Sequence, residues 1–492
     1  MYPPVRAPLA THRLIQLLDI DGVNQYIDTM TIYLPTLAAS AASKADRIAM
    51  AIDADIKTGR LKPNERLPTH RALALGLNVT PGTVSRAYAL LEQQGRIRGE
   101  VGRGTFVTDP KRRSSDIVVS AGAPNETVID LAVNRNASKW VENAVAQALL
   151  SLDREQMLGT LMTYQPDSGM ARHRSAWTQF LASLGVETHP DRLVLTAGAQ
   201  HATFLILSVL ASPGDVVLAE EFTYAGFKAL ADELRLRLEP VRVDAHGMVP
   251  DDLARVAKST GAKWLYLMPQ VQNPTMACMP DHRRESLLHI ARSLDLRIIE
   301  DGAYDALRPN TAAPLVSRDP DRVFYVTTLS KCLAPGLRIG CIVAPENWSS
   351  RLARAIRRSM WMIPVLGAEL SARWIETSEM LSLLKKQRRE LEQRGASLRS
   401  ILPELTKDLS IDCGFAWIKL PDEVRSEAVV AAAQELGVMI APTEAFSLRK
   451  GSASGFVRLN LSACVSLSEL QLALGKVKPL LQGGSLNDGS YY

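Results

Sequence analysis

The chain has 492 residues and a formal net charge of +5, with 46% hydrophobic and 22% charged residues. This length exceeds what one hydrophobic core can support, so we expect two or three domains, and the composition excludes wholesale disorder and collagen-like repeats. The five cysteines contain no CxxC pair, which argues against a disulfide framework or structural zinc, and we predict no metal site. Without a signal-peptide pattern or an apolar run long enough to span a bilayer, we expect a cytoplasmic protein that has no membrane partner.

The positive charge is concentrated near the beginning of the chain. Residues 41–113 contain fourteen Lys and Arg against seven Asp and Glu, whereas the remainder of the chain is nearly balanced. A local excess of this kind is typical of a surface that binds a polyanion, and a solvated basic surface is the alternative. Residues 1–40 precede this segment as an N-terminal extension of mixed pattern.

Residues 41–108 have the pattern of three helices followed by a β-hairpin. Isoleucines spaced four residues apart predict the first helix, which Ser43 can cap at its start. Thr80 and Pro81 suit the N-cap and the first position of the third helix. Residues 96–107 alternate around a glycine-rich tip, as expected of a hairpin. This order of elements predicts a winged helix-turn-helix.

In a helix-turn-helix the second helix of the motif enters the major groove of DNA, with its first residues near the bases. The helix before it and the hairpin tip are placed to contact phosphate or the minor groove. The candidate DNA-binding residues are the exposed side chains of these three places: Arg71, Thr80, Thr83, Ser85, Arg86 and Arg103. The alternative is that these residues only solvate a small helical bundle.

Residues 109–127 are polar, basic and rich in Pro, Ser and Gly, and we interpret them as an interdomain linker. From residue 128 to residue 482, strand-like runs such as VVLAE, WLYLMP and RIIED alternate with helix-length stretches. This alternation predicts an α/β domain with a mostly parallel sheet, and the later runs predict a smaller α+β subdomain. Residues 483–492 have the composition of a loose tail.

Four polar groups in the α/β region follow predicted strands at their carboxyl ends, where open α/β sheets bind ligands. Lys331 follows the strand VFYVTTL, Asp301 ends RIIED, Asn273 follows WLYLMP, and the turn at 196–200 leads from a strand into a helix. An amine, a carboxylate, an amide donor and a cradle of backbone N–H groups are what a pyridoxal phosphate site requires. Taken singly, each has a structural alternative as a surface lysine, a helix cap or a turn former.

Two parts of the chain resemble known families. Residues 59–107, GRLKPNERLPTHR through RGTFV, resemble the winged-helix domain of GntR-family transcription regulators. Residues 128–480 resemble the fold-type I aminotransferases of class I/II, because the motifs NPT, DGAY and SKCLAPGLRIG occur in this order. The combination is similar to the MocR-type regulators. The resemblance implies a winged helix-turn-helix joined to an aminotransferase-like domain that binds pyridoxal 5'-phosphate.

The resemblance also implies roles for individual residues. Lys331 is similar to the catalytic lysine that forms the Schiff base, and Asp301 to the acid that pairs with the pyridine nitrogen. The other cofactor-binding residues that it implies are ring-oxygen donors, a stacking aromatic and phosphate binders: Asn273, Tyr304, Tyr224, Ala199, Gln200, Thr328, Ser330 and Arg338. Tyr164 resembles the tyrosine that reaches the phosphate of the partner subunit, which implies a homodimer. Arg458 resembles the arginine that clamps a substrate carboxylate, which makes it the candidate for effector binding.

Together these features predict a pyridoxal phosphate-dependent DNA-binding transcription regulator. We expect its aminotransferase-like domain to sense a small amino compound as an external aldimine, and its dimer to bind a double-stranded operator with two half-sites. Two alternatives remain open at this point. One is an active class I/II aminotransferase with an appended DNA-binding module, and the other is a regulator that senses pyridoxal phosphate itself.

Overall fold

The computed structural model divides into two compact units, residues 1–111 and residues 112–492, and each has its own hydrophobic core. The predicted linker 109–127, the hairpin tip with Arg103, the extension up to residue 32 and the tail from residue 485 lie outside the described residues. The structure describes residues 33–37, 43–62, 65–93, 96–100, 104–107, 128–134, 136, 138–154, 157–308, 312–422, 424–449 and 455–484.

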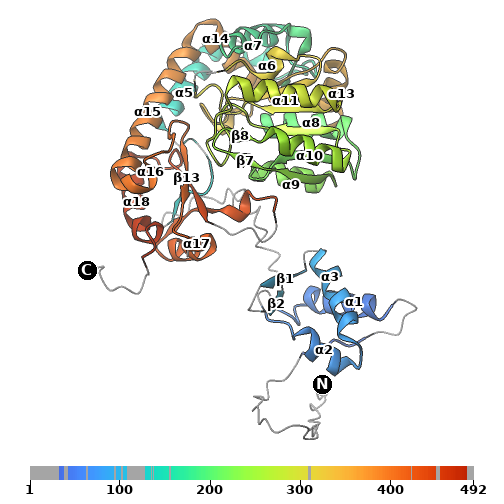
Figure 1. Cartoon of the computed structure of the whole chain (residues 1–492). Helices are drawn as coiled ribbons and strands as arrows, with labels where there is room; N and C mark the ends of the chain where they lie inside the picture. Colours follow the sequence, from blue (N-terminus) through green and yellow to red (C-terminus); the bar gives the residue numbers. More distant parts are fainter. Residues whose placement is uncertain are drawn as a thin grey trace, which may run out of the picture. The chain divides into compact units, whose positions relative to one another are not determined.

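In its described residues, the first unit has three helices and a two-stranded antiparallel sheet, which is the predicted winged helix-turn-helix (Figure 1). Its core is formed by apolar side chains from every element, among them Ile48, Ile52, Val84, Tyr88 and Leu91, which are at most 3% exposed. These residues confirm the helical periodicities read from the sequence. The elements are α1 (Lys44–Lys57), α2 (His70–Leu77), α3 (Pro81–Gln93), β1 (Ile97–Glu100) and β2 (Gly104–Val107).

The helices of this unit begin at hydroxyl side chains: Ser43 and Thr80 were predicted from the sequence, and Thr69 is an additional cap. The Ser43 hydroxyl accepts a hydrogen bond from the backbone N–H of Asp46 at the start of α1, and Thr69 caps α2 in the same way. At the start of α3, the Thr80 hydroxyl accepts from the Thr83 N–H over 3.3 Å. Such caps satisfy N–H groups that have no partner inside the helix, and they fix where each helix begins.

The second unit is built on a seven-stranded sheet in which every strand but one runs in the same direction. The strands are nearly continuous apolar runs because helices cover both faces of the sheet. Its order is β4 (Leu193–Thr196), β12 (Gly340–Val343), β11 (Val323–Thr328), β10 (Arg297–Asp301), β9 (Trp264–Leu267), β5 (Val216–Glu220) and β6 (Arg237–Val241), and β12 is the antiparallel strand. This arrangement confirms the predicted mostly parallel α/β sheet.

Helices pack against this sheet and continue into the C-terminal part of the chain (Figure 1). The helices of the larger part are α5 (Lys139–Arg154), α6 (Leu158–Leu161), α7 (Ala171–Ser183), α8 (Ala199–Leu210), α9 (Ala225–Glu233), α10 (Pro250–Thr260), α11 (Asp281–Ser293), α12 (Leu315–Arg318), α13 (Ser349–Met360) and α14 (Val365–Glu376). Short elements between them are η1 (Pro190–Arg192), β7 (Val243–Asp244), β8 (Gly247–Met248) and η2 (Pro335–Leu337). No helix in the described part of the chain is both long and apolar enough to cross a membrane.

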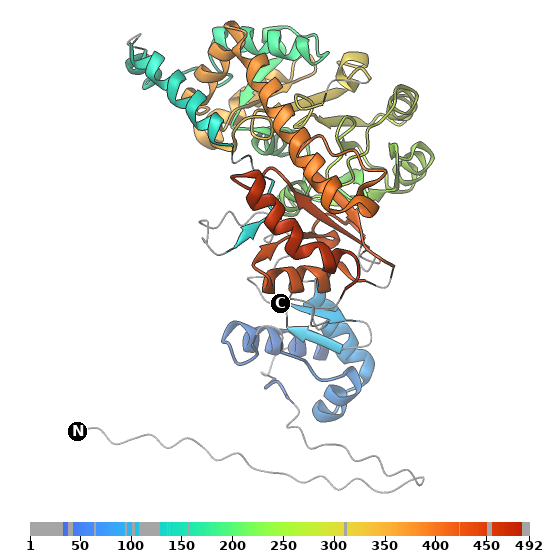
Figure 2. The same cartoon turned by 90° about the vertical axis from the view of Figure 1, so that its left-hand side faces the viewer.

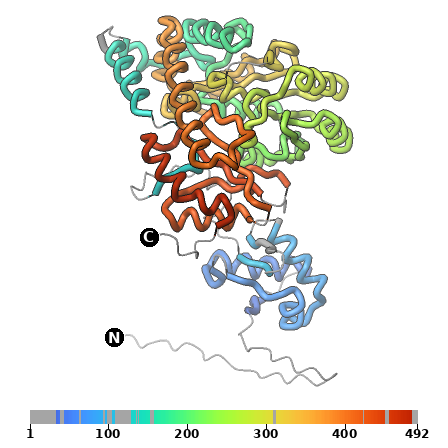
Figure 3. Tube along the Cα trace, turned by 60° about the vertical axis from the view of Figure 1, so that its left-hand side comes forward, coloured from blue at the N-terminus to red at the C-terminus, as the bar shows by residue number. Residues whose placement is uncertain are grey.

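The smaller α+β part confirms the predicted subdomain and has a core of its own. It consists of α15 (Glu379–Ile401), α16 (Pro403–Thr406), β13 (Phe415–Lys419), α17 (Ser426–Glu435), β14 (Val438–Met439), β15 (Ala441–Pro442), η3 (Thr443–Ala445), β16 (Phe456–Asn460) and α18 (Leu467–Leu481). The early strand β3 (Ile129–Asp130) pairs in parallel with β14. Figures 2 and 3 accordingly show β3, in teal, among the red elements of the C-terminal part.

Candidate functional site

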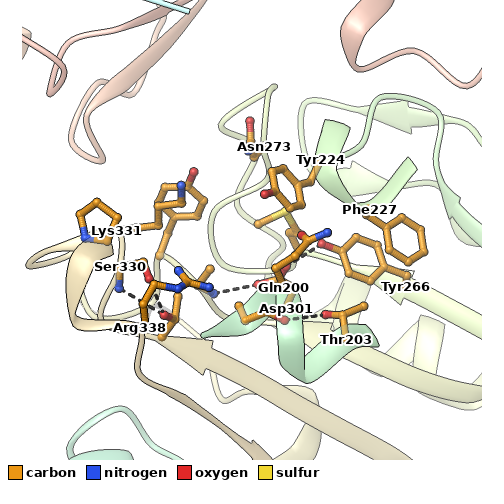
Figure 4. A pocket seen from close by; sticks show the side chains of 16 residues that line it. Gln200, Thr203, Tyr224, Phe227, Tyr266, Asn273, Asp301, Ser330, Lys331 and Arg338 are labelled. Atoms are coloured by element: carbon orange, nitrogen blue, oxygen red, sulfur yellow. Dashed lines mark hydrogen bonds between the residues drawn. The ribbon is translucent and has the colours of Figure 1, made fainter. Parts of the chain in front are cut away.

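A pocket lies at the carboxyl edge of the large sheet, where the predicted polar groups converge (Figure 4). Asp301 ends β10, Lys331 follows β11, Asn273 follows β9 and Tyr224 follows β5. Because these strands are parallel, their carboxyl ends meet at one edge. All the predicted cofactor-binding residues except Tyr164 line this pocket: Ala199, Gln200, Tyr224, Asn273, Asp301, Tyr304, Thr328, Ser330, Lys331 and Arg338.

Lys331 follows β11 and is partly buried, and the charges of Arg458, Asp301 and Arg338 act on its amine. Burial, together with the positive charge of Arg458, lowers the pKa of Lys331 to about 8, and the negative charge of Asp301 opposes this effect. The Lys331 Nζ donates a hydrogen bond to the backbone oxygen of Asn134 over 2.9 Å. A substantial fraction of the amine is therefore neutral near physiological pH, and a neutral amine is a nucleophile.

Asp301 is 5% exposed, and burial raises the pKa of its carboxyl group. The hydroxyl of Tyr266 donates to Asp301 Oδ2 over 2.6 Å, and the backbone N–H of Ala303 donates to Oδ1 over 3.0 Å, so both oppose this rise. Tyr266 stacks in parallel on Phe227, with 3.7 Å between ring centroids. Two donors and a stacked ring therefore fix the orientation of this buried carboxylate.

Asn273, Tyr304 and Arg458 form a second buried group, and each is at most 2% exposed. Arg458 Nη1 donates to Asn273 Oδ1 over 2.9 Å, and Nη2 donates to the Ala132 oxygen over 2.6 Å. The guanidinium carbon also lies 4.6 Å from the ring centroid of Phe446. Burial lowers the pKa of Arg458, and its Nε has no hydrogen-bond partner among the residues that the structure describes.

The start of α8 forms the predicted cradle of backbone N–H groups. Gly198 is the N-cap with φ of +89°, and a Cβ at this position would lie 3.2 Å from Arg338 Nη2. The positive φ therefore favours glycine here, and a side chain would also require the Arg338 guanidinium to shift. Thr328 and Ser330 are buried beside this cradle with their hydroxyl oxygens 3.0 Å apart. Helix N–H groups, hydroxyls and a guanidinium are suitable ligands for a phosphate group.

These observations fit pyridoxal phosphate. The buried Asp301 suits a protonated pyridine nitrogen, and the cradle at Gly198, which a Cβ would partly fill, suits the phosphate. Tyr224 lies at the side of the pocket opposite Lys331 (Figure 4). Tyr164 does not reach the pocket of its own chain: it is 79% exposed, and its ring packs 5.7 Å from that of Trp361, which is also exposed.

In the first unit, Thr80, Thr83 and Arg86 line a hollow together with Ser43 and Lys44. The hollow therefore joins the N-terminal ends of α1 and α3, whose N–H groups and dipoles favour anions. Two further predicted contacts, Arg71 and Ser85, are exposed on α2 and α3, and the Ser85 hydroxyl lies 3.0 Å from Nδ1 of His70. The described candidates thus lie on exposed parts of adjoining helices.

Sequence reasoning missed three residues of these sites: Tyr266, Asn134 and Lys44. Tyr266 lies within an apolar strand, where a tyrosine resembles an ordinary core residue. Asn134 precedes Lys331 by 197 residues, and no local pattern connects the two. Lys44 follows the helix cap, and its approach to α3 depends on the packing of α1 on α3. All three became identifiable only through tertiary contacts.

Comparisons with known proteins match both units. The profile of the family Aminotransferase class I and II matches residues 126–477, and that of Bacterial regulatory proteins, gntR family, matches residues 44–107. The chain is similar to the HTH-type transcriptional regulator YdeF of Bacillus subtilis (strain 168), with 26% identity over 460 residues, 93% of this chain and 99% of YdeF. It is also similar to the HTH-type transcriptional regulator YdcR of Escherichia coli (strain K12), with 27% identity over 448 residues, 85% of this chain and 94% of YdcR.

Among solved structures, the fold is similar to that of LysN, the α-aminoadipate aminotransferase of Thermus thermophilus. The TM-score is 0.66 and the sequence identity 23%, over 81% of this chain and 98% of LysN. That enzyme was solved with N-(5'-phosphopyridoxyl)-L-leucine bound. At this level of identity the likeness establishes the fold of the second unit.

Proposed function

We propose that this chain, which belongs to the aminotransferase class I and II family and also carries a gntR-family domain, is a MocR-type transcription regulator. We further propose that a carboxylate-bearing amino compound controls it. The cofactor is pyridoxal phosphate, which supplies an aldehyde carbon that condenses with an amine. Lys331 provides the amine of the protein, Asp301 holds the pyridine nitrogen, and Asn273 with Tyr304 holds the ring oxygen. Ala199, Gln200, Thr328, Ser330 and Arg338 hold the phosphate.

The observation that carries the effector proposal is the environment of Arg458. Its guanidinium is 1% exposed, bonds to Asn273 and keeps an unpartnered Nε among the described residues. A buried polar hydrogen without an acceptor costs free energy, and a carboxylate would satisfy it. An arginine also binds a carboxylate through two parallel hydrogen bonds, which selects for ligands that carry this group.

The proposed assembly is a homodimer that binds an operator with two half-sites. Support comes from the phosphate end of the pocket, where Gln200 and Arg338 are exposed, and from the exposed pair Tyr164 and Trp361. A partner subunit that covers this end would bring its own tyrosine to the phosphate. Two winged helices would then follow the two-fold symmetry of a palindromic site.

The test uses the full-length protein loaded with pyridoxal phosphate. A specific operator is first selected from a random double-stranded DNA library, and footprinting is expected to show two half-sites. The protein is then titrated with a panel of amino acids and amines, and the visible spectrum, the operator affinity and the release of keto acid are followed in parallel. At least one amino acid should change both the spectrum and the operator affinity, while turnover stays below ~1 per second.

Variants of Arg458 make this test specific. Arg458→Gln should lose both responses to carboxylate-bearing compounds and keep its operator affinity in their absence. Arg192→Gln is the matched control, because Arg192 bonds to the backbone oxygens of Ala344 and Pro320. Brisk turnover without any change in operator affinity would identify an aminotransferase with an appended DNA-binding module. A response to pyridoxal phosphate and to no amine would identify a cofactor sensor.

A further inference from the structure

His201 is the third residue of α8 and directly follows the proposed phosphate binders Ala199 and Gln200. Its ring nitrogen Nδ1 accepts a hydrogen bond from the backbone N–H of Ala197 over 3.1 Å. His201 is not among the described residues that line the pocket. An effect of this histidine on a bound phosphate must therefore pass through the backbone that it holds.

The contact between His201 and Ala197 takes the place of a cap that glycine cannot provide. Gly198 is the N-cap of α8, and it has no side chain that could accept a hydrogen bond from a backbone N–H group. In a capping box, the side chain at the third helical position reaches back to a backbone N–H at the helix start. His201 occupies this third position and reaches the residue just before the N-cap. The turn that leads into α8 is thus held by a side chain of the helix itself.

Ala197 is also held at its carbonyl group. Arg338 Nη2 donates to the Ala197 oxygen over 2.6 Å, and the Thr196 hydroxyl donates to the Gly198 oxygen over 3.1 Å. His201 and Arg338 therefore fix the N–H and the C=O of one residue, which immediately precedes the cradle at Gly198. A rotation of Ala197 would change the direction of the cradle and would also release the Arg338 guanidinium from its present place.

The ring of His201 is a neutral acceptor. Its Nδ1 can accept a hydrogen bond only when it carries no proton, so the proton of the neutral ring lies on Nε2. Burial, together with the positive charge of Arg338, lowers the pKa of His201 to about 4, and the ring is accordingly neutral near physiological pH. Nε2 is buried and has no hydrogen-bond partner among the described residues, which costs free energy. The favourable polar contact of this ring is therefore the one that Nδ1 makes with Ala197.

We propose that His201 is a positioning residue for the phosphate group of the cofactor. By holding the Ala197 N–H, it sets the direction of the N–H groups at the start of α8 and the place of the Arg338 guanidinium. Donors that are fixed in advance bind an anion more tightly, because less freedom has to be lost on binding. This inference rests on the proposed function, since it adds a residue to the proposed phosphate site.

Two variants of His201 and one control separate the acceptor from the bulk of the ring. His201→Leu removes the acceptor and keeps an apolar side chain in its place. His201→Asn restores an acceptor, because Oδ1 of asparagine is as far along the side chain as Nδ1 of histidine. The control is His189→Leu, since Nδ1 of His189 accepts from the Asp191 N–H over 3.3 Å at the start of η1. The control thus loses the same kind of contact at a residue that is not among those lining the pocket.

The full-length apoprotein of each form is titrated with pyridoxal 5'-phosphate and with pyridoxal, which lacks the phosphate group. Inorganic phosphate serves as a competitor, and a thermal scan measures the stability of the apoprotein. His201→Leu should bind pyridoxal phosphate and inorganic phosphate about tenfold more weakly, the effect of one weakened hydrogen bond to a charged group. Its affinity for pyridoxal and its melting temperature should equal those of the unmodified protein. His201→Asn should recover most of the lost affinity, and His189→Leu should lose none.

The comparison of the two ligands decides between a positioning role and a purely structural one. Equal weakening of pyridoxal phosphate and pyridoxal, or a lower melting temperature of His201→Leu, would make His201 a structural residue and overturn the inference. Full affinity of His201→Leu for pyridoxal phosphate, or no recovery in His201→Asn, would overturn it as well. In these cases the phosphate site stands as long as the unmodified protein prefers pyridoxal phosphate to pyridoxal. Without that preference, the proposed phosphate site falls, and the role of His201 falls with it.

Discussion

Arg71, Thr80 and Arg86 of the winged-helix unit are exposed on helix surfaces, whereas Asp301 and Arg458 of the aminotransferase-like unit are only 5% and 1% exposed. The difference follows from the ligands. DNA is a polyanion too large to enclose, so exposed cations bind it by releasing counterions, and salt weakens the binding. A cofactor or amino acid is enclosed, and its charges meet groups that have already lost their water. Substitutions in the first unit should therefore reduce the affinity for DNA by degrees. Substitutions in the second unit should instead remove a function, such as attachment of the cofactor or the response to the effector.

The largest expected effect is that of Lys331→Ala, which should abolish the covalent, borohydride-reducible adduct with pyridoxal phosphate. Lys228→Met is the control, because burial also lowers the pKa of Lys228 to about 8. The Lys228 Nζ, however, donates to three backbone oxygens, those of Glu444, Ala445 and Ser447. Mass spectrometry after reduction should find the adduct in the control and not in Lys331→Ala. An adduct that persists in Lys331→Ala would refute the assignment.

Asp301→Asn should weaken retention of the cofactor by about 100-fold. The substitution removes the charge that faces the pyridine nitrogen, and losing one partner of a buried pair costs about 2–5 kcal/mol. Tyr266→Phe removes one of the two donors to Asp301 and should cost less, about 1–2 kcal/mol. Equilibrium dialysis of the cofactor measures both. Equal retention by Asp301→Asn and the unmodified protein would mean that another group holds the ring nitrogen.

Arg86→Ala should weaken operator binding by about 1–3 kcal/mol if the guanidinium reads a base edge. A smaller and uniform loss on operator and random DNA would instead assign Arg86 to a phosphate. Arg237, which is exposed in the second unit, provides the control Arg237→Ala. Salt titrations of both variants add a second readout, since a lost phosphate contact lowers the slope of log affinity against log salt by about one.

The rate at which apoprotein takes up pyridoxal phosphate should increase about tenfold from pH 7 to pH 9. The reason is the pKa of Lys331, which burial and Arg458 lower to about 8. The neutral amine is the reactive form, and its fraction increases as pH rises through this pKa. Stopped-flow absorbance measures the rate. A profile still rising steeply above pH 10 would show that the amine keeps an ordinary pKa.

Those parts of the fold and sites that obey local rules were predictable from the sequence. Caps such as Ser43 and strand-end residues such as Asp301 follow from helix and sheet geometry that neighbouring residues reveal. Tyr266 was not predictable in this way, because it becomes a partner of Asp301 only when β9 pairs with β10. Asn134 likewise meets Lys331 only after β3 joins the C-terminal part. Sequence patterns specify elements and their ends, and tertiary pairing decides which distant side chains meet.

The smallest expected effect concerns Thr69, whose hydroxyl accepts from the Ala72 N–H at the start of α2. Thr69→Ala should lower the stability of the winged-helix unit by about 1 kcal/mol, the usual cost of a lost N-cap. For a unit of this size that is a shift of about 4–8 °C in its melting temperature. Because each unit has its own core, the melting temperature of the visible cofactor band should not shift.

Circular dichroism and visible absorbance recorded in one thermal scan separate the two transitions. The control is Thr69→Ser, which keeps the hydroxyl and should melt like the unmodified protein. A cofactor band that melts at a lower temperature in Thr69→Ala would show that the two units unfold together. The two units would then differ in how they bind their ligands but would not be independent in stability.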